Sequence, residues 1–194
     1  MGPLWWAALA AGLAYVGVLV TDTPGPVRLL KVLPALLLAL ALGPTHPVAA
    51  AGMVLSGVGD AFLLDKDRFF LHGLVAFLLG HVLFVGAFLL ASGGTPSWPA
   101  LGGLFVFAAV FLAVLRPKKR LLKIAAPVYA LVLCAMVAAA STLGPLGVAG
   151  GLTFLVSDAL LAIRQFRRDF RGASTAVIVT YYASLLTLAA ALTR

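Results

Sequence analysis

Two aspartates are the residues of this sequence best placed to do chemistry. Asp60 and Asp158 each lie inside a long apolar run, whereas the other acidic residues lie between such runs. A charged side chain at the centre of a membrane helix costs about 2.5–3.5 kcal/mol on insertion scales, and asparagine or serine would supply a structural hydrogen bond more cheaply. We therefore favour a functional site over the alternative, an interhelical hydrogen bond. Paired carboxyl groups are suited to general acid–base catalysis.

Three further polar residues fall at a similar depth. Counted from the ends of their runs at about 1.5 Å per residue, Asp60 and Asp158 lie roughly 7–9 Å inside. Lys31, Tyr129 and Tyr181 lie roughly 6–12 Å inside, counted from the same side of the predicted bundle. All five are therefore expected to share one site. For Lys31 two interpretations stay open: contact with the phosphate of a lipid headgroup, or a side chain that extends to the aqueous interface.

The histidines and the cysteine give no evidence of a metal. His81 is counted about two helical turns deeper than the aspartates, where a catalytic histidine and a hydrogen-bonded core histidine are equally compatible. The three histidines show no i, i+3 or i, i+4 pairing, and the single cysteine, Cys134, has no second cysteine to pair with. No metal and no cofactor are predicted, and a ligand set of two aspartates with His81 is the one alternative left open.

The composition predicts the elements that must position these residues. Of 194 residues, 63% are hydrophobic and only 10% are charged, whereas a soluble domain needs about 25% charged residues. The sequence therefore predicts an all-α membrane protein, with residues 1–194 forming a single integral membrane domain. The net charge of +8 comes from short basic clusters between apolar runs. Such clusters suit anionic lipid rather than nucleic acid, so membrane lipids are the expected partners.

Apolar runs separated by breaks that contain proline or glycine predict eight transmembrane helices in one bundle, since a span needs about 20 residues. The predicted spans are Leu4–Val20, Val27–Leu42, Pro47–Leu64, Phe69–Ala91, Pro99–Leu115, Leu121–Thr142, Pro145–Ile163 and Ser174–Leu192. The second is the shortest, so the span count depends on it most.

The basic residues predict how these spans are oriented. With eight spans, every lysine and arginine except Arg194 falls on one side of the membrane. Positive residues mark the cytoplasmic side, so both termini are predicted to lie outside. Trp5, Trp6 and Trp98 fall on the outer side, as interfacial tryptophans do. The expected location is a cell membrane, which in a bacterium is the inner membrane.

Two short matches indicate an internal repeat. Arg28–Lys31 and Arg120–Lys123 both read Arg-Leu-Leu-Lys, and both membrane aspartates follow a small residue and precede an alanine. Two four-helix halves in the same orientation, residues 1–97 and 98–194, would form a parallel repeat with a site at their interface.

Five short motifs follow one another along the chain: Lys31-x-x-Pro34, Gly59-Asp60-x-x-Leu63-Leu64, Gly73-x-x-x-Phe77-x-x-x-His81, Ser157-Asp158-x-x-Leu161-Ala162 and Thr180-Tyr181-Tyr182. In these motifs, and in their order from about Leu29 to Leu192, the chain resembles the YhhN-type family of lysoplasmalogenases. It departs from the family pattern at Phe84, where tyrosine is common. A second departure is Pro127-Val128-Tyr129, where proline and tyrosine are usually adjacent.

The resemblance implies a membrane enzyme whose substrate is a lysophospholipid with a vinyl ether bond, cleaved to a fatty aldehyde and a glycerophospho-alcohol. Protonation of the vinyl β-carbon gives an oxocarbenium ion, water adds, and the hemiacetal collapses. Asp60 and Asp158 are the expected general acid and base, in an order that the sequence leaves open, by the logic of two-carboxylate glycosidases. The residues expected to bind the substrate or orient the carboxyls are Lys31, His81, Tyr129, Ser157 and Tyr181.

Two other classes of protein stay open. A small proton-coupled transporter or lipid flippase would use the same aspartates as a proton relay, although its acids would then be expected at the bilayer midplane. A non-catalytic receptor or scaffold would have no need for two buried acids. The sequence contains no G-x-S-x-G motif of a serine hydrolase. It does not predict the headgroup preference or the oligomeric state.

Overall fold

The computed structural model describes residues 2–21, 26–96, 98–115 and 120–194, and in this part of the chain it contains helices and no strand. The prediction of an all-α protein is confirmed. The helices are α1 Pro3–Val20, η1 Pro26–Val32, α2 Leu33–Leu42, α3 Pro47–Phe62, η2 Leu63–Asp65, α4 Lys66–Ser92, α5 Trp98–Leu115, α6 Arg120–Ser141, α7 Pro145–Phe166 and α8 Ala173–Leu192, where η marks a 3₁₀ helix.

The helix ends agree with the predicted spans to within a few residues, except in the second span. There the 3₁₀ helix η1 precedes the ten-residue α2, in place of one continuous helix over Val27–Leu42. Pro34 lies in the first turn of α2, where its missing N–H breaks no helical hydrogen bond. Further inside a helix the proline ring would clash with the carbonyl group four residues before it. The α-helix therefore begins at Leu33.

Six of the described helices are long and apolar enough to cross a membrane, namely α1, α3 with η2, α4, α6, α7 and α8. The ten residues of α2 are too few for a span, and the apolar stretch counted in α5 is the shorter Leu104–Ala113. The chain is therefore a multi-pass helical membrane protein.

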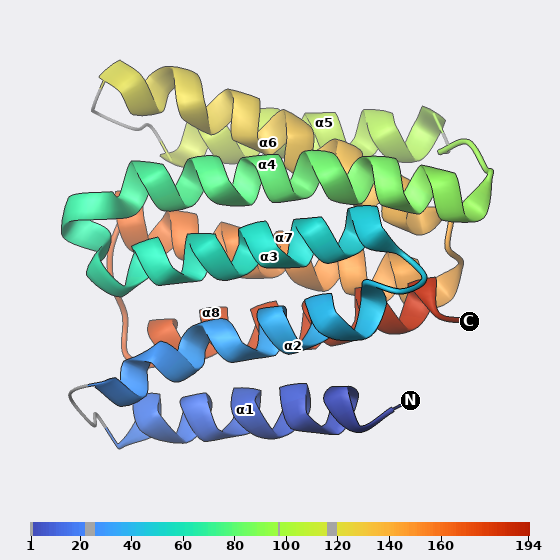
Figure 1. Cartoon of the computed structure of the whole chain (residues 1–194). Coiled ribbons are helices and arrows are strands. Elements are labelled where there is room, and N and C mark those ends of the chain that lie inside the picture. Colours follow the sequence, from blue (N-terminus) through green and yellow to red (C-terminus); the bar gives the residue numbers. More distant parts are fainter. Residues whose placement is uncertain (1, 22–25, 97, 116–119) are drawn as a thin grey trace.

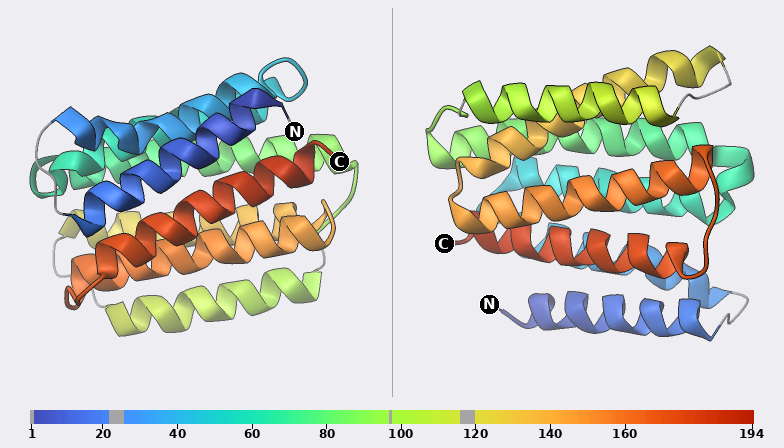
Figure 2. Two further views of the ribbon diagram at one scale, coloured as in Figure 1. Left: turned by 90° about the horizontal axis from the view of Figure 1, so that it is seen from below. Right: turned by 180° about the vertical axis from the view of Figure 1, so that it is seen from behind.

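The helices run side by side in one bundle (Figure 1). α1 lies at one edge, against α2 and α8, and α5 lies at the opposite edge, mainly against α6 (Figure 2). The most extensive contacts are those of α7 with α8 and of α3 with α4. The two ends of the chain lie at the same end of the bundle (Figure 1).

Two glycines let α3 and α4 pack closely. A Cβ atom on Gly52 would lie 2.7 Å from the ring of Phe84, and one on Gly59 would lie 2.6 Å from the ring of Phe77. Both distances are shorter than the roughly 3.5 Å of a carbon–carbon contact, so a larger residue would push the helices apart. Small residues at helix interfaces are typical of membrane bundles. The close packing holds the last turn of α3, which carries Asp60, against α4.

Candidate active site

Asp60 is buried in an ion pair. Its Oδ1 atom lies 3.2 Å from the ammonium nitrogen of Lys31, which also donates a hydrogen bond to the Asp60 carbonyl oxygen at 3.3 Å. Lys31 belongs to η1, whose backbone is bound by α8, because the Tyr182 hydroxyl donates to the Lys31 carbonyl oxygen at 2.9 Å. Only 7% of Lys31 is exposed, so its side chain does not extend to the aqueous interface.

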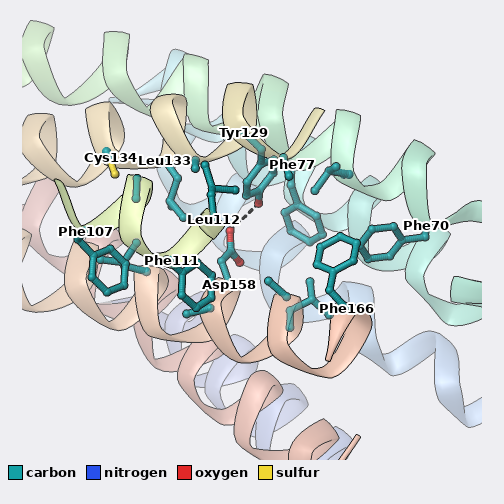
Figure 3. A pocket seen from close by; sticks show the side chains of 18 of the residues that line it. Phe70, Phe77, Phe107, Phe111, Leu112, Tyr129, Leu133, Cys134, Asp158 and Phe166 are labelled. Carbon is teal, nitrogen blue, oxygen red and sulfur yellow. Dashed lines mark hydrogen bonds between the residues drawn. The ribbon is translucent and has the colours of Figure 1, made fainter. Parts of the chain in front are cut away.

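Asp158, on α7, has different partners. The hydroxyl of Tyr129, on α6, donates a hydrogen bond to Oδ2 of Asp158 at 2.5 Å (Figure 3). Nε2 of His81, on α4, lies 4.0 Å from the same oxygen. In the described part of the chain no lysine or arginine forms an ion pair with Asp158. The two carboxyl groups therefore differ, because a cation faces Asp60 and a phenol hydroxyl faces Asp158.

Counting depth from the helix ends does not predict that His81 lies beside Asp158. The count assumes that all helices end in one plane, but α4 has 27 residues against 16 in α3, and it is kinked at Phe69 in its first turn. The contact of His81 with Asp158 shows instead that this deeper part of α4 lies level with Asp158. There the imidazole contacts the rings of Tyr129 and Phe154, whose centroids are 5.3 and 4.8 Å away.

Several buried polar atoms around the two carboxyls lack hydrogen bonds. Among the described residues, the unpaired atoms are Oδ2 of Asp60, the Tyr181 hydroxyl and both ring nitrogens of His81. Ser157 is bonded elsewhere, since its hydroxyl donates to the Val177 carbonyl oxygen of α8 at 3.0 Å. An unpaired buried polar group costs roughly 1–3 kcal/mol, so a cluster of them indicates that a ligand or water completes the site.

Both aspartates line one cavity of about 300 Å³, which we call the polar cavity. The structure brings five of the seven predicted site residues to it: Lys31, Asp60, Ser157, Asp158 and Tyr181. Tyr129 and His81 are not part of its wall and reach it only through their contacts with Asp158. Two arginines that the sequence did not single out, Arg28 and Arg164, also line the polar cavity.

A second space, which we call the apolar pocket, lies between α4, α5, α6 and α7 (Figure 3). Asp158 and Tyr129 are the polar groups of its wall, which otherwise consists largely of aromatic and aliphatic side chains such as Phe77, Phe107 and Phe111. The sequence does not predict these apolar residues as part of a site. Phenylalanine inside a membrane span is equally suited to the core or the lipid face, so its presence does not predict a pocket. The one sequence signal is the i, i+4 spacing of Phe107 and Phe111, which places both rings on the same face of their helix.

The donor groups do not gather as metal ligands. In the described part of the chain no three His, Cys, Asp or Glu side chains lie together as a metal site would need. The alternative set of two aspartates with His81 is not assembled, because Asp60 pairs with Lys31 while His81 lies beside Asp158.

Comparison with known proteins gives one family. The model of the YhhN family matches residues 6–192 of this chain. The chain is 34% identical to lysoplasmalogenase TMEM86B of Homo sapiens, over 84% of this chain and 74% of that protein. It is 34% identical to TMEM86B of Sus scrofa, over 80% and 70%, and 30% identical to TMEM86B of Mus musculus, over 93% and 81%. No solved structure gives a significant match.

Proposed function

Because this chain belongs to the YhhN family, we propose that it is a hydrolase that cleaves the vinyl ether bond of lysoplasmalogens. Its relatives named above are lysoplasmalogenases, and a vinyl ether needs a proton donor and a carboxylate within one site. The observation that carries the proposal is the pair of buried aspartates from α3 and α7, which line one cavity with different partners.

The different partners of the two aspartates support a different catalytic role for each. The ammonium of Lys31 at 3.2 Å compensates the charge of Asp60, which suits a carboxylate that acts as base. No lysine or arginine of the described chain compensates Asp158, and an uncompensated buried carboxylate is costly, so we assign Asp158 as the neutral acid. The Tyr129 hydroxyl donates to Oδ2 of Asp158, which leaves Oδ1 to carry the proton that is transferred.

The proposed reaction consumes one water molecule and needs no other co-reactant. Asp158 donates its proton to the β-carbon of the vinyl ether, and the resulting oxocarbenium ion takes up water at the α-carbon while Asp60 accepts a proton from that water. When the hemiacetal collapses, Asp60 returns this proton to the departing glycerol oxygen and Asp158 accepts the hemiacetal hydroxyl proton. Both aspartates regain their starting states, and the products are a fatty aldehyde and a glycerophospho-alcohol.

We assign the binding of the substrate phosphate to a residue other than Lys31. Lys31 donates to Asp60 within the polar cavity, so we assign it to Asp60 rather than to the substrate phosphate, which was one of the two interpretations left open by the sequence. Arg28 is exposed, lies in η1 and lines the polar cavity. A guanidinium group binds phosphate through two parallel hydrogen bonds. We therefore assign the phosphate of the headgroup to Arg28.

A parallel repeat of two four-helix halves, residues 1–97 and 98–194, is supported by two equivalent contacts. The residue that contacts each aspartate lies 29 positions before it: Lys31 before Asp60, and Tyr129 before Asp158. The Arg-Leu-Leu-Lys match of the sequence does not share this register, so the contacts are the better evidence for the repeat. Each half would thus supply one carboxyl and its partner to a site between them.

Eight spans with both termini outside are the proposed topology. The seven residues of η1 at about 2.0 Å and the ten of α2 at about 1.5 Å together cover roughly 29 Å, close to the hydrocarbon thickness of a bilayer. The basic residues Arg28, Arg68 and Arg164 lie near the helix ends away from the chain termini. That end is therefore assigned to the cytoplasm.

Cysteine labelling tests this topology in intact cells. Thr95 and Arg168 are exposed and lie in connections at opposite ends of the bundle. In a Cys134→Ala background, we expect a membrane-impermeant maleimide to label Thr95→Cys directly and Arg168→Cys only after the cells are made permeable. Labelling of both positions from the same side would overturn the eight-span topology.

An aldehyde assay tests the function. We expect the purified protein in micelles to release fatty aldehyde from a 1-alkenyl lysophospholipid and from neither the 1-acyl nor the 1-alkyl analogue, because only the alkenyl compound has a double bond to protonate. Folded protein that releases no aldehyde, yet moves the lipid or protons across a liposome membrane, would instead identify the transporter.

A further inference from the structure

The polar cavity and the apolar pocket adjoin one another. Five residues line both of them: Leu63, Phe70, Phe77, Asp158 and Leu161. Asp158 is the one ionisable group among the five. The catalytic acid assigned above thus stands at the boundary between a polar space, which contains the basic residues, and an apolar one.

We propose that the apolar pocket binds the hydrocarbon chain of the substrate, an inference that rests on the proposed function. A lysoplasmalogen has one hydrocarbon chain, one polar headgroup and a vinyl ether between them. With the headgroup in the polar cavity and the chain in the apolar pocket, the vinyl ether lies beside Asp158. Among the described residues the apolar pocket, unlike the polar cavity, is lined by no lysine or arginine, so it suits a hydrocarbon chain better than a phosphate.

The apolar pocket runs along the helices, in the direction in which the hydrocarbon chain of a membrane lipid extends. It extends from Phe70 and Phe166 near the basic end of the bundle, past Asp158, to Phe107 and Cys134 deeper in the helices (Figure 3). A substrate whose phosphate lies at the basic end would therefore point its chain toward the middle of the bilayer, as membrane lipids do.

The residues of α5 that line the apolar pocket are expected to limit the length of the hydrocarbon chain that fits. Phe107 and Phe111 of α5 line the apolar pocket with their rings stacked, the centroids 5.7 Å apart and the ring planes inclined by 10°. Between them Ala108 faces the pocket and is 5% exposed, whereas its neighbour Ala109 is exposed on the bundle surface. α5 makes few contacts with α7, so the pocket is bounded there by side chains more than by close helix packing.

The apolar pocket is expected to select by shape more than by affinity. A chain that leaves the bilayer for an apolar pocket exchanges one hydrocarbon environment for another, so it gains little hydrophobic free energy. Filling the pocket would therefore exclude long chains sterically and leave short chains unaffected. Steric discrimination of this kind in an apolar site amounts to roughly 10–200-fold.

Leucine substitutions at two adjacent positions test the inference. We expect Ala108→Leu to lower kcat/KM about tenfold or more for an 18-carbon alkenyl lysophospholipid and less than about twofold for a four-carbon analogue. Ala109→Leu is the matched control, because it adds the same side chain on the exposed face of α5, and both values should stay within about twofold. Equal losses for the two substrates in Ala108→Leu, or no loss for either, would overturn the chain-binding role.

Photo-crosslinking separates this inference from the proposed function. The probe is a 1-alkyl lysophospholipid with a diazirine in its chain, which lacks the vinyl ether and cannot be cleaved. We expect label on the side chains of Phe107, Phe111 or Leu133, assigned residue by residue, and reduced by excess unlabelled 1-alkyl lysophospholipid. Label confined to lipid-facing residues such as Leu90 and Val110, and insensitive to competition, contradicts the chain site even if aldehyde is released. Competed label on the pocket without aldehyde release supports the site and contradicts the reaction.

Discussion

Asp158→Asn is expected to abolish aldehyde release from an alkenyl lysophospholipid while the protein keeps its fold. Asparagine has nearly the shape of aspartate, and its amide oxygen can still accept the Tyr129 hydroxyl hydrogen bond. It cannot donate a proton to carbon, so the loss should reach the roughly 10²–10⁴-fold of a missing general acid. Turnover is measured by aldehyde release at saturating substrate, and the fold is checked by thermal unfolding in micelles.

Asp60→Asn is expected to abolish turnover too, with a different effect on stability. It removes the proposed base, but it also leaves the Lys31 ammonium buried without its carboxylate, which destabilises the protein. Asp67→Asn is the matched control, because Asp67 is exposed in the first turn of α4, outside both cavities. Near-normal aldehyde release from Asp60→Asn or Asp158→Asn would contradict the two-carboxylate mechanism. If Asp67→Asn also lost activity, the losses would reflect the removal of negative charge in general rather than of a catalytic group.

The sequence predicts most of the fold because membrane spans leave a simple pattern. Apolar length and the prolines and glycines between spans predict the helix ends to within a few residues, and the cost of burying acids identifies Asp60 and Asp158. The exception, the 3₁₀ start of the second span, follows from Pro34. That proline is visible in the sequence, but whether it kinks a helix or begins one depends on the neighbouring helices.

The partners of the two acids cannot be predicted in the same way. Depth along a span follows from residue counting, but the side of a helix that faces a neighbour depends on how the helices are rotated and tilted. For that reason the pairing of Lys31 with Asp60 and the contact of His81 with Asp158 emerge only from the structure. The apolar pocket is likewise invisible in the sequence, because its phenylalanines resemble any other residues of a span.

Lys31→Met is expected to lower both stability and turnover, because it breaks the buried ion pair with Asp60. Lys31→Met should leave a buried carboxylate without a cation, which costs about 3–5 kcal/mol when one partner of a buried pair is removed. Either the protein becomes less stable by that amount or Asp60 takes up a proton and can no longer act as base. Because an unpaired buried charge is neutralised rather than kept, we expect protonation of Asp60 to prevail and kcat to fall about 10²-fold or more, the loss expected for a missing base.

Arg28→Gln provides the contrasting variant. If Arg28 contacts the phosphate, its loss removes binding that is the same in the ground state and the transition state, so KM should rise about tenfold with kcat unchanged. Lys31→Met should instead lower kcat. A Lys31→Met variant that raises KM alone would indicate that Lys31 itself contacts the phosphate, which is one of the two interpretations of the sequence. It would also remove the physical basis for assigning Asp60 as the base.

Combining the two ion-pair substitutions isolates the interaction itself. Lys31→Met with Asp60→Asn leaves neither a buried cation nor a buried carboxylate, so the double variant should unfold at a higher temperature than either single variant. Catalysis should not recover, because the base is still missing. Stability losses that simply add would mean that Lys31 and Asp60 do not interact in the folded protein. A large coupling in stability combined with inactivity in all three variants is the result that only a catalytic carboxylate held by Lys31 predicts.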